Sequence, residues 1–234
     1  MTASNPFHAG ELAAQDKAGT RGAASELAVG QRSTLNFSSN HDAFLAAQSF
    51  AVVSSVDQED DNLWVTPLFG KAGDITAASE TEILISSACI PKGDVLNNAK
   101  PGTPLSMLGI DLMKRTRHRI NGIAGENSGG SLIHFEVKEY SPNCPKYINR
   151  RELIPAASNP INESAVRQER TTLTESDRDF IKSMDTLWIG SYAPNVGADA
   201  NHRGGKPGFI RVTSDSIVHF FIRIQRKRNV LYLW

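Results

Sequence analysis

The sequence predicts a mainly β (α+β) protein, an antiparallel β-barrel with accessory helices, from three observations. Short runs of β-branched and aromatic residues alternate with polar turns between residues 50 and 140. Helix-favouring composition is strongest near the N-terminus. The 234 residues, of which 40% are hydrophobic, suffice for one sizeable domain with extensions. Because the formal net charge is zero, any anion-binding site must be a local cluster of basic residues.

The N-terminal part of the chain is predicted to be helical. Residues 8–30 are rich in Ala, Leu, Glu and Gln and are interrupted by glycines, which favours one or two short helices. Asn40 is the expected N-cap of another short helix, in residues 41–50. We therefore expect a helical extension at residues 1–40 and the main domain at residues 41–220.

The first half of the main domain is predicted to be a β-meander whose strands are joined by polar turns. The expected strands are residues 50–56, 63–70, 83–87, 105–112, 117–125 and 131–140. A short helix is expected at residues 94–102, because Pro101 and Gly102 then end it.

The second half is predicted to place a helix between irregular segments and two more strands. Thr174 and Asp177 have the spacing of a capping box at the start of this helix. The irregular segments are rich in Pro, Gly and Asn. In chain order we expect a surface loop at 155–172, the helix at 173–185, a strand at 186–193, a loop at 194–207 and a strand at 208–212.

Two cysteines, Cys89 and Cys144, are too few for a disulfide framework and lack CxxC spacing, which favours a reducing compartment. The sequence shows no secretory signal pattern and no apolar stretch near the roughly 20 residues that span a bilayer. We therefore expect a soluble, cytoplasmic protein.

The segment KRTRHR is the first candidate for binding. Alternate side chains of a strand share a face, so Arg115, Arg117 and Arg119 would form one cationic row. Guanidinium groups hold phosphate through paired N–H donors, so the row suits a phosphorylated ligand. A solvated strand face and an RNA-binding stripe are the alternatives.

The segment DANHRGGKPGF is the second candidate. Gly204 and Gly205 allow the backbone to approach a ligand closely, and His202, Arg203 and Lys206 supply donors and positive charge. An anion-binding loop and an ordinary glycine-rich hairpin turn explain the segment equally well. The GGxxG spacing does not match a dinucleotide fingerprint.

Other candidates are weaker. Cys144 has no local histidine as a base, which favours a structural thiol over a nucleophile, and Lys146 is either a further phosphate cation or an exposed lysine. His8 and Glu11, one turn apart, are either catalytic or helix-surface residues. Motifs for serine hydrolysis, phosphate loops and zinc are absent, so the catalytic residues are unknown and no metal is expected.

Four segments together resemble the pyridoxamine 5′-phosphate oxidase-like family of FMN-dependent proteins: FHAGELAAQDKAG, LGIDLMKRTRHRINGIAGE, YSPNCPKYINRREL and GADANHRGGKPGFIRV. Their order and spacing match over about residues 7–219. The resemblance implies an FMN-binding split β-barrel that forms a homodimer, with FMN in clefts between the subunits. The cofactor-binding residues that we expect are Arg115, Arg117, Arg119, Lys146, His202, Arg203, Gly204, Gly205 and Lys206.

The function that the resemblance implies is that of an FMN-binding oxidoreductase, which transfers two electrons to or from an unknown small molecule. The alternatives are a non-catalytic flavin- or haem-binding module, a degenerate paralogue and, less favoured, a nucleic-acid-binding barrel. The expected partners are FMN, a small-molecule substrate and a second copy of the chain, with no nucleic acid and no membrane.

The resemblance stops near Phe220. Related sequences continue with Pro-Asp-Tyr-x-Gly-Asn, whereas this chain continues with FIRIQRKRNVLYLW. We expect residues 221–234 to be an aberrant terminus, for instance from a retained intron or a frameshift, with consequences for barrel completion and for cofactor affinity. A segment that touches a membrane surface is the alternative.

Overall fold

The computed structural model describes residues 7–28, 39–126, 130–154, 171–215 and 217–220. The chain is mainly β, as the sequence predicts, with a seven-stranded antiparallel sheet and two further two-stranded sheets. The strands of the large sheet are β1 (Phe50–Val56), β2 (Leu63–Phe69), β3 (Ile75–Ser79), β4 (Glu82–Ser86), β5 (Pro104–Asp111), β6 (Thr116–Ala124) and β7 (Leu132–Asn143). The expectations for residues 155–170 and 221–234 fall outside the described residues.

The remaining elements follow the chain on either side of this sheet. The helices are α1 (Ala9–Ala18), α2 (Arg21–Ala28), α3 (Ser39–Ala46) and α4 (Glu175–Ser183), with 3₁₀ turns η1 (Ser87–Cys89) and η2 (Val95–Asn98). The other strands are β8 (Thr186–Ala193), β9 (Gly197–Gly204), β10 (Ile210–Ser214) and β11 (Ile217–Phe220). Within the described residues no helix is long and apolar enough to cross a membrane.

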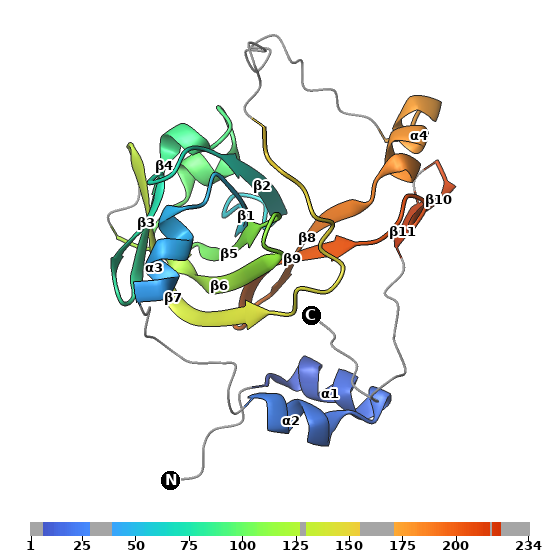
Figure 1. Ribbon diagram of the computed structural model, residues 1–234, viewed down its shortest axis with the longest axis horizontal. Helices are drawn as coiled ribbons and strands as arrows, with labels where there is room; N and C mark the ends of the chain where they lie inside the picture. The colour runs from blue at the N-terminus through green and yellow to red at the C-terminus, as the bar shows by residue number, and fades with distance from the viewer. Residues whose placement is uncertain (1–6, 29–38, 127–129, 155–170, 216, 221–234) are drawn as a thin grey trace.

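The large sheet has the order β2-β1-β5-β6-β7-β4-β3. β1 lies between β2 and β5, with Val53 opposite Thr66 on one side and Met107 on the other. Figure 1 shows the sheet curled about its own interior. The described residues form no ladder between the two edge strands β2 and β3, so the curled sheet is confirmed and a closed ring of strands is not.

The interior of the curl holds the main apolar core. Its fully buried side chains include Ile83, Met107, Ile120 and Phe135, one from each of four strands. These residues alternate with polar or outward-facing ones along their strands, which is the period-two pattern that the sequence shows. α3 covers one side of this core and inserts Leu45, which is 1% exposed.

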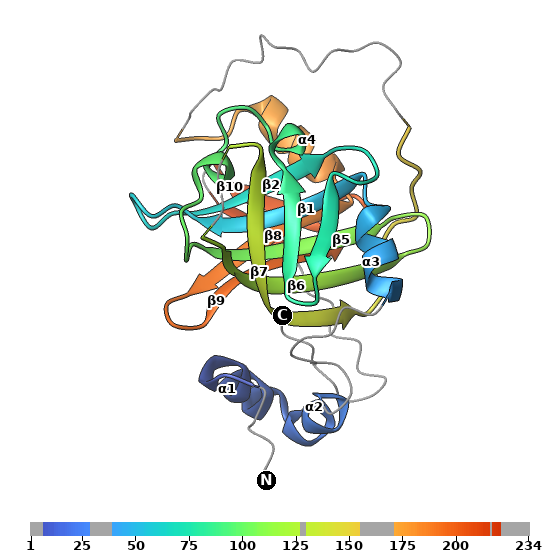
Figure 2. The same cartoon turned by 90° about the vertical axis from the view of Figure 1, so that its left-hand side faces the viewer.

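The β8–β9 hairpin packs across the outer face of the same sheet, beside β1, β2, β5 and β6 (Figure 2). Gly190 allows this close crossing, because a Cβ there would lie 2.9 Å from a methyl carbon of Val65 and 3.1 Å from Cβ of Ser54. A second, smaller apolar cluster fills the space between the layers, and Trp188 of β8 packs against it.

The prediction of a loop at residues 194–207 is wrong for most of its length. Only residues 194–196 form a turn, and the chain then returns as β9 with Gly197 opposite Ala193. Asn195 and Gly197 have φ values of 64° and 123°, so turn residues are needed at the hairpin tip alone. Composition rich in Gly and Asn concealed a strand whose small residues permit close packing.

The N-terminal helices agree with the sequence, and the capping analysis corrects one candidate. His8 is the N-cap of α1, where its ring nitrogen accepts from the backbone N–H groups of Gly10 and Glu11. The Glu11 carboxylate accepts from the His8 backbone N–H in return. This is a capping box, so the geometry favours the structural alternative over catalysis. α3 begins at Ser39, so Asn40 lies inside it and is not its N-cap.

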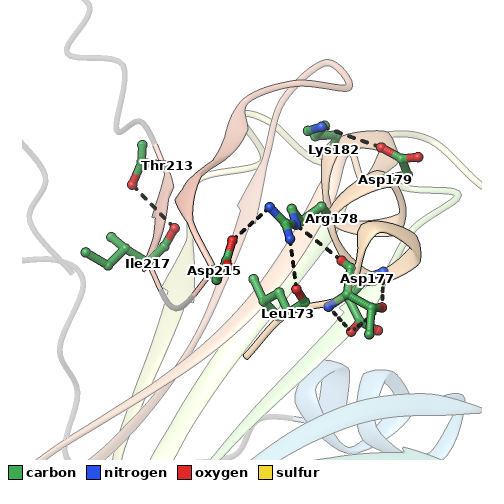
Figure 3. Close-up of polar contacts among 9 residues, drawn as sticks. Leu173, Asp177, Arg178, Asp179, Lys182, Thr213, Asp215 and Ile217 are labelled. Atoms are coloured by element: carbon green, nitrogen blue, oxygen red, sulfur yellow. Dashed lines mark hydrogen bonds and ion pairs between the residues drawn. The ribbon is translucent and has the colours of Figure 1, made fainter. Parts of the chain in front are cut away.

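α4 and the β10–β11 hairpin form a small lobe held by polar contacts (Figure 3). Thr174 and Asp177 make the predicted capping box. Arg178 then links helix to hairpin, with its Nη1 2.8 Å from Oδ1 of Asp215 and its Nη2 donating to the carbonyl of Leu173. Three apolar side chains of this lobe, those of Phe180, Ile217 and Val218, are exposed, whereas that of Ile210 is buried.

We predict that Gly122→Ala destabilises the fold. A Cβ at this position would lie 1.9 Å from the carbonyl oxygen of Glu136, at the bulge between β6 and β7. Such overpacking costs about 1–3 kcal/mol of unfolding free energy, measurable by urea denaturation. Gly22→Ala in α2 is the control, because open space surrounds Gly22 and alanine favours helix. Equal stability of both variants would refute the close approach.

Candidate anion-binding site

β6 presents two of the predicted arginines toward β9. Arg117 and Arg119 both contact β9 residues, so the expected shared face is confirmed for this pair. Arg115 does not join them, because it lies in the exposed turn before β6 with a φ of 56°. Arg115 therefore lies outside the strand whose alternate side chains share a face. The observed row contains only two of the three predicted arginines.

Arg117 is held by three acceptors. Its Nε donates to the carbonyl of Cys144 at 3.1 Å, and its Nη1 lies 3.0 Å from Nδ1 and 3.2 Å from the carbonyl oxygen of His202. Burial, reinforced by the charges of Arg203 and Arg119, lowers the pKa of Arg117 to about 10. The guanidinium is therefore still protonated near neutral pH, although burial of its charge costs free energy.

Arg119 is 2% exposed and pairs with Asp199, with 3.3 Å between Nε and Oδ1. Asn121, two residues further along the same face, donates to the same carboxylate oxygen at 2.8 Å. Ser106 of β5 donates to Asn121 at 2.6 Å and accepts from the backbone N–H of Ala200. This network fixes β9 against β5 and β6. The burial of Arg119 shows that the solvated-face alternative is wrong for this residue.

His202 is buried beside Arg117. Its ring lies 5.1 Å from that of Trp188, and only 2% of its surface is exposed. Because arginine cannot accept a hydrogen bond, the contact from Arg117 makes Nδ1 the acceptor and places the ring proton on Nε2. Burial, followed by the charges of Arg117 and Arg203, lowers the pKa of His202 to about 3, so the ring is neutral. Its buried Nε2 has no hydrogen-bond partner within the described residues.

Arg203 completes the cluster. Its Nη1 donates to the carbonyl of His202 at 3.1 Å. Burial and the charge of Arg119 lower the pKa of Arg203. The charges of Arg203 and Arg119 thus disfavour the charged form of Arg117, the charge of Arg119 disfavours that of Arg203, and Asp199 pairs directly with Arg119. An anion near the three guanidinium groups would relieve this repulsion.

The glycine-rich part of the second candidate serves chain packing in this structure. A Cβ at Gly204 would lie 1.9 Å from the carbonyl oxygen of Tyr147, so only glycine fits there. The N–H of Gly205 donates to the carbonyl of Asp185, which leaves this N–H engaged within the protein. Lys146 and Lys206 are exposed. The cofactor contacts expected of these four positions stay predictions.

Sequence reasoning missed three members of the site: Ser106, Asn121 and Asp199. Asn121 had a usable signal, because it continues the alternation of Arg117 and Arg119 by one more step. Asp199 had none once its segment was expected to be a loop. Within the described residues no group of three or more His, Cys, Asp or Glu side chains is arranged to hold a metal ion.

No family model and no curated protein matches the chain. Among solved structures, a Lactobacillus delbrueckii protein described provisionally as a pyridoxamine 5′-phosphate oxidase is 14% identical, with a TM-score of 0.35 over 46% of this chain and 98% of its own. A tagged variant of HupZ from Group A Streptococcus is 10% identical, with a TM-score of 0.37 over 46% of this chain and 100% of its own. Both likenesses extend over less than half of this chain.

We predict that His202 makes the fold sensitive to acid. Its pKa falls from 6.5 to about 3 on folding, so between these values the unfolded chain binds more protons than the folded one. The free energy of unfolding therefore decreases as pH falls below 6.5, by up to about 1.4 kcal/mol per pH unit. His202→Gln should remove the share of this dependence due to His202 in urea denaturation between pH 6.5 and about 4.5. The share due to His118, whose burial lowers its pKa to about 4, should remain.

His134→Gln is the matched control, because His134 is only partly buried and pairs with Glu82 at 2.6 Å. This variant should retain the steep dependence that His202 causes. If His202→Gln left the slope unchanged while His134→Gln reduced it, the neutral, buried state of His202 would be disproved.

Proposed function

We propose that the chain is an FMN-binding protein of the oxidoreductase type, in which Arg117, Arg119, Arg203 and His202 hold the phosphate of FMN. The observation that carries the proposal is that two partly buried arginines, Arg117 and Arg203, contact the neutral, buried His202, with the buried Arg119 near both arginines. The resemblance of the KRTRHR and HRGGKPGF segments to FMN-dependent proteins supports FMN as the source of the phosphate.

The residues fit a phosphate in both charge and hydrogen bonding. Neighbouring guanidinium charges lower the pKa of Arg117 and of Arg203, so both would gain from a dianion. Guanidinium groups also donate to phosphate oxygens in pairs. The Nε2–H of His202 is a buried donor without a partner among the described residues, and a phosphate oxygen would accept from it. When bound, the flavin would supply two-electron chemistry toward a small molecule.

The protein's own residues orient the donors. The carbonyl groups of Cys144 and His202 hold the Arg117 side chain, and Asp199 holds that of Arg119. Asn121 in turn holds Asp199. The donors are therefore fixed before a ligand arrives, so less side-chain entropy is lost on binding than with mobile arginines.

We predict that Arg117→Ala weakens FMN binding. Loss of a charge-assisted hydrogen bond costs about 1.5–3 kcal/mol, which raises the dissociation constant by about 10- to 150-fold. Titration of FMN fluorescence measures the change. Arg115→Ala is the control, because Arg115 lies in the same segment but in an exposed turn, and it should bind FMN like the native chain.

Riboflavin, which lacks the phosphate, distinguishes a phosphate contact from a general disturbance of the site. Its affinity should be equal in the native and Arg117→Ala proteins. Unchanged FMN affinity in Arg117→Ala would remove this arginine from the proposed site, whereas equal loss for both flavins would assign it a structural role.

We also propose that the chain forms a homodimer. The α4 and β10–β11 lobe supports this, because Phe180, Ile217 and Val218 are 65%, 49% and 43% exposed. Exposed apolar side chains of this kind are typical of interaction surfaces. Two-fold dimers are also the commonest soluble assembly.

We predict that Phe180→Asp shifts the assembly toward the monomer, because a carboxylate resists burial in an apolar interface. Light scattering should give twice the chain mass for the native protein and a lower mass for the variant at equal concentration. A native protein that scatters as a monomer would contradict the proposed homodimer.

A further inference from the structure

A small polar cavity lies at the end of β1, and its lining contains no residue of the arginine cluster. Its volume is about 100 Å³. The end of β1, the turn that leads to β2, and the segment from η2 to Thr103 enclose it. The side chains important for its chemistry are those of Ser55, Asp57, Glu59, Asn98, Lys100 and Thr103.

Two buried hydroxyl groups line this cavity. Ser55 and Thr103 are each 2% exposed, and within the described residues neither hydroxyl oxygen has a hydrogen-bond partner. The Ser55 backbone lies in register with both β2 and β5, and the N–H and carbonyl groups of Thr103 bond to Lys100 and Ala124. The two hydroxyls are thus the polar groups left to be satisfied, and buried hydroxyls are normally paired.

The position of Ser55 on β1 distinguishes it from a serine that only fills space in the core. Ser55 shares the face of β1 that carries Ala51 and Val53, which belong to the main core. Ser54 points the other way, toward the crossing of Gly190. The Ser55 hydroxyl lies at the end of the apolar core and lines the same cavity as the hydroxyl of Thr103, which is likewise unpaired within the described residues. This arrangement indicates that polar atoms occupy the cavity.

The rim of the cavity favours a positive group. Asp57 and Glu59 contribute two carboxylates and Lys100 one ammonium, so the rim carries a net negative charge near neutral pH. The Oδ1 atom of Asp57 accepts from the backbone N–H of Glu59 at 2.9 Å, which leaves its second oxygen for a ligand. Hydroxyl, amide and carboxylate oxygens together form an acceptor-rich wall, which suits a donor-rich ligand.

We propose that this cavity binds a small primary amine that also carries a hydroxyl group. An ammonium supplies three donors to the hydroxyl and carboxylate oxygens, and the ligand's hydroxyl pairs with the opposite wall. A cavity of about 100 Å³ is smaller than the roughly 150 Å³ that holds benzene, so the ligand has only a few non-hydrogen atoms. This site is independent of the proposed flavin function.

The test is a titration of the isotope-labelled full chain with ethanolamine, followed by amide ¹H–¹⁵N spectra. Ethylene glycol and acetate serve as size-matched neutral and anionic probes. Ethanolamine should give saturable shifts around Ser55 and Thr103, with at least about tenfold higher affinity than either of the other probes.

Variants assign the shifts to the cavity. Thr103→Val keeps the shape but removes the hydroxyl, and Glu59→Gln removes a rim charge from an exposed side chain that the fold does not need. Each should weaken ethanolamine by several-fold, whereas Glu80→Gln, an exposed carboxylate in the β3–β4 turn, should not. Because Glu59→Gln leaves the core intact, it remains informative if Thr103→Val fails to fold.

Three results would overturn the proposal. The absence of saturable shifts would mean that water alone fills the cavity. Equal binding of ethylene glycol would show that the ammonium is not recognised, and stronger binding of acetate would show that Lys100 rather than the two carboxylates controls the site.

Discussion

The burial of β1 on both faces is the constraint on which the rest of the structure depends. All seven of its residues are buried, with strands paired on both of its edges. One face of β1 packs against the main core, so its other face stays buried only because a second layer covers it. The β8–β9 hairpin supplies that layer, and Gly190 lets it lie close. Covering β1 in this way brings His202 of β9 onto Arg117 of β6.

The same covering layer explains the electrostatics of the candidate anion-binding site. Arginine on an open strand face would be solvated, whereas here β9 removes Arg119 and much of Arg117 from water. The fold holds these charges through Asp199, Asn121 and backbone carbonyl groups. Buried ion pairs of this kind contribute little net stability, because desolvation offsets the attraction.

The two proposed binding sites share one physical feature, which is a buried polar atom without a partner among the described residues. In each, a buried polar atom within the described residues lacks a partner: the Nε2 of His202 in one, and the hydroxyls of Ser55 and Thr103 in the other. Their charges are opposite, with guanidinium groups around the first and carboxylates at the rim of the second. The contrast predicts ligands of opposite sign at the two places.

The sequence by itself determined the elements whose signals are local. Alternation of apolar residues predicted β1, β2, β5, β6 and β8 to within about a residue, and the Thr174–Asp177 spacing predicted the start of α4. The same alternation placed Arg117 and Arg119 on one face. Such patterns depend on residues that are close along the chain, so they can be recognised without knowledge of the fold.

Only the tertiary structure decided which distant residues meet. It made residues 197–204 a strand, because pairing with β8 outweighs a composition that favours turns. It removed Arg115 from the arginine row through a left-handed turn, and it joined Asp199 to Arg119 across 80 residues of sequence. Contacts of this range depend on how layers stack. Neither propensity nor spacing along the chain carries that information.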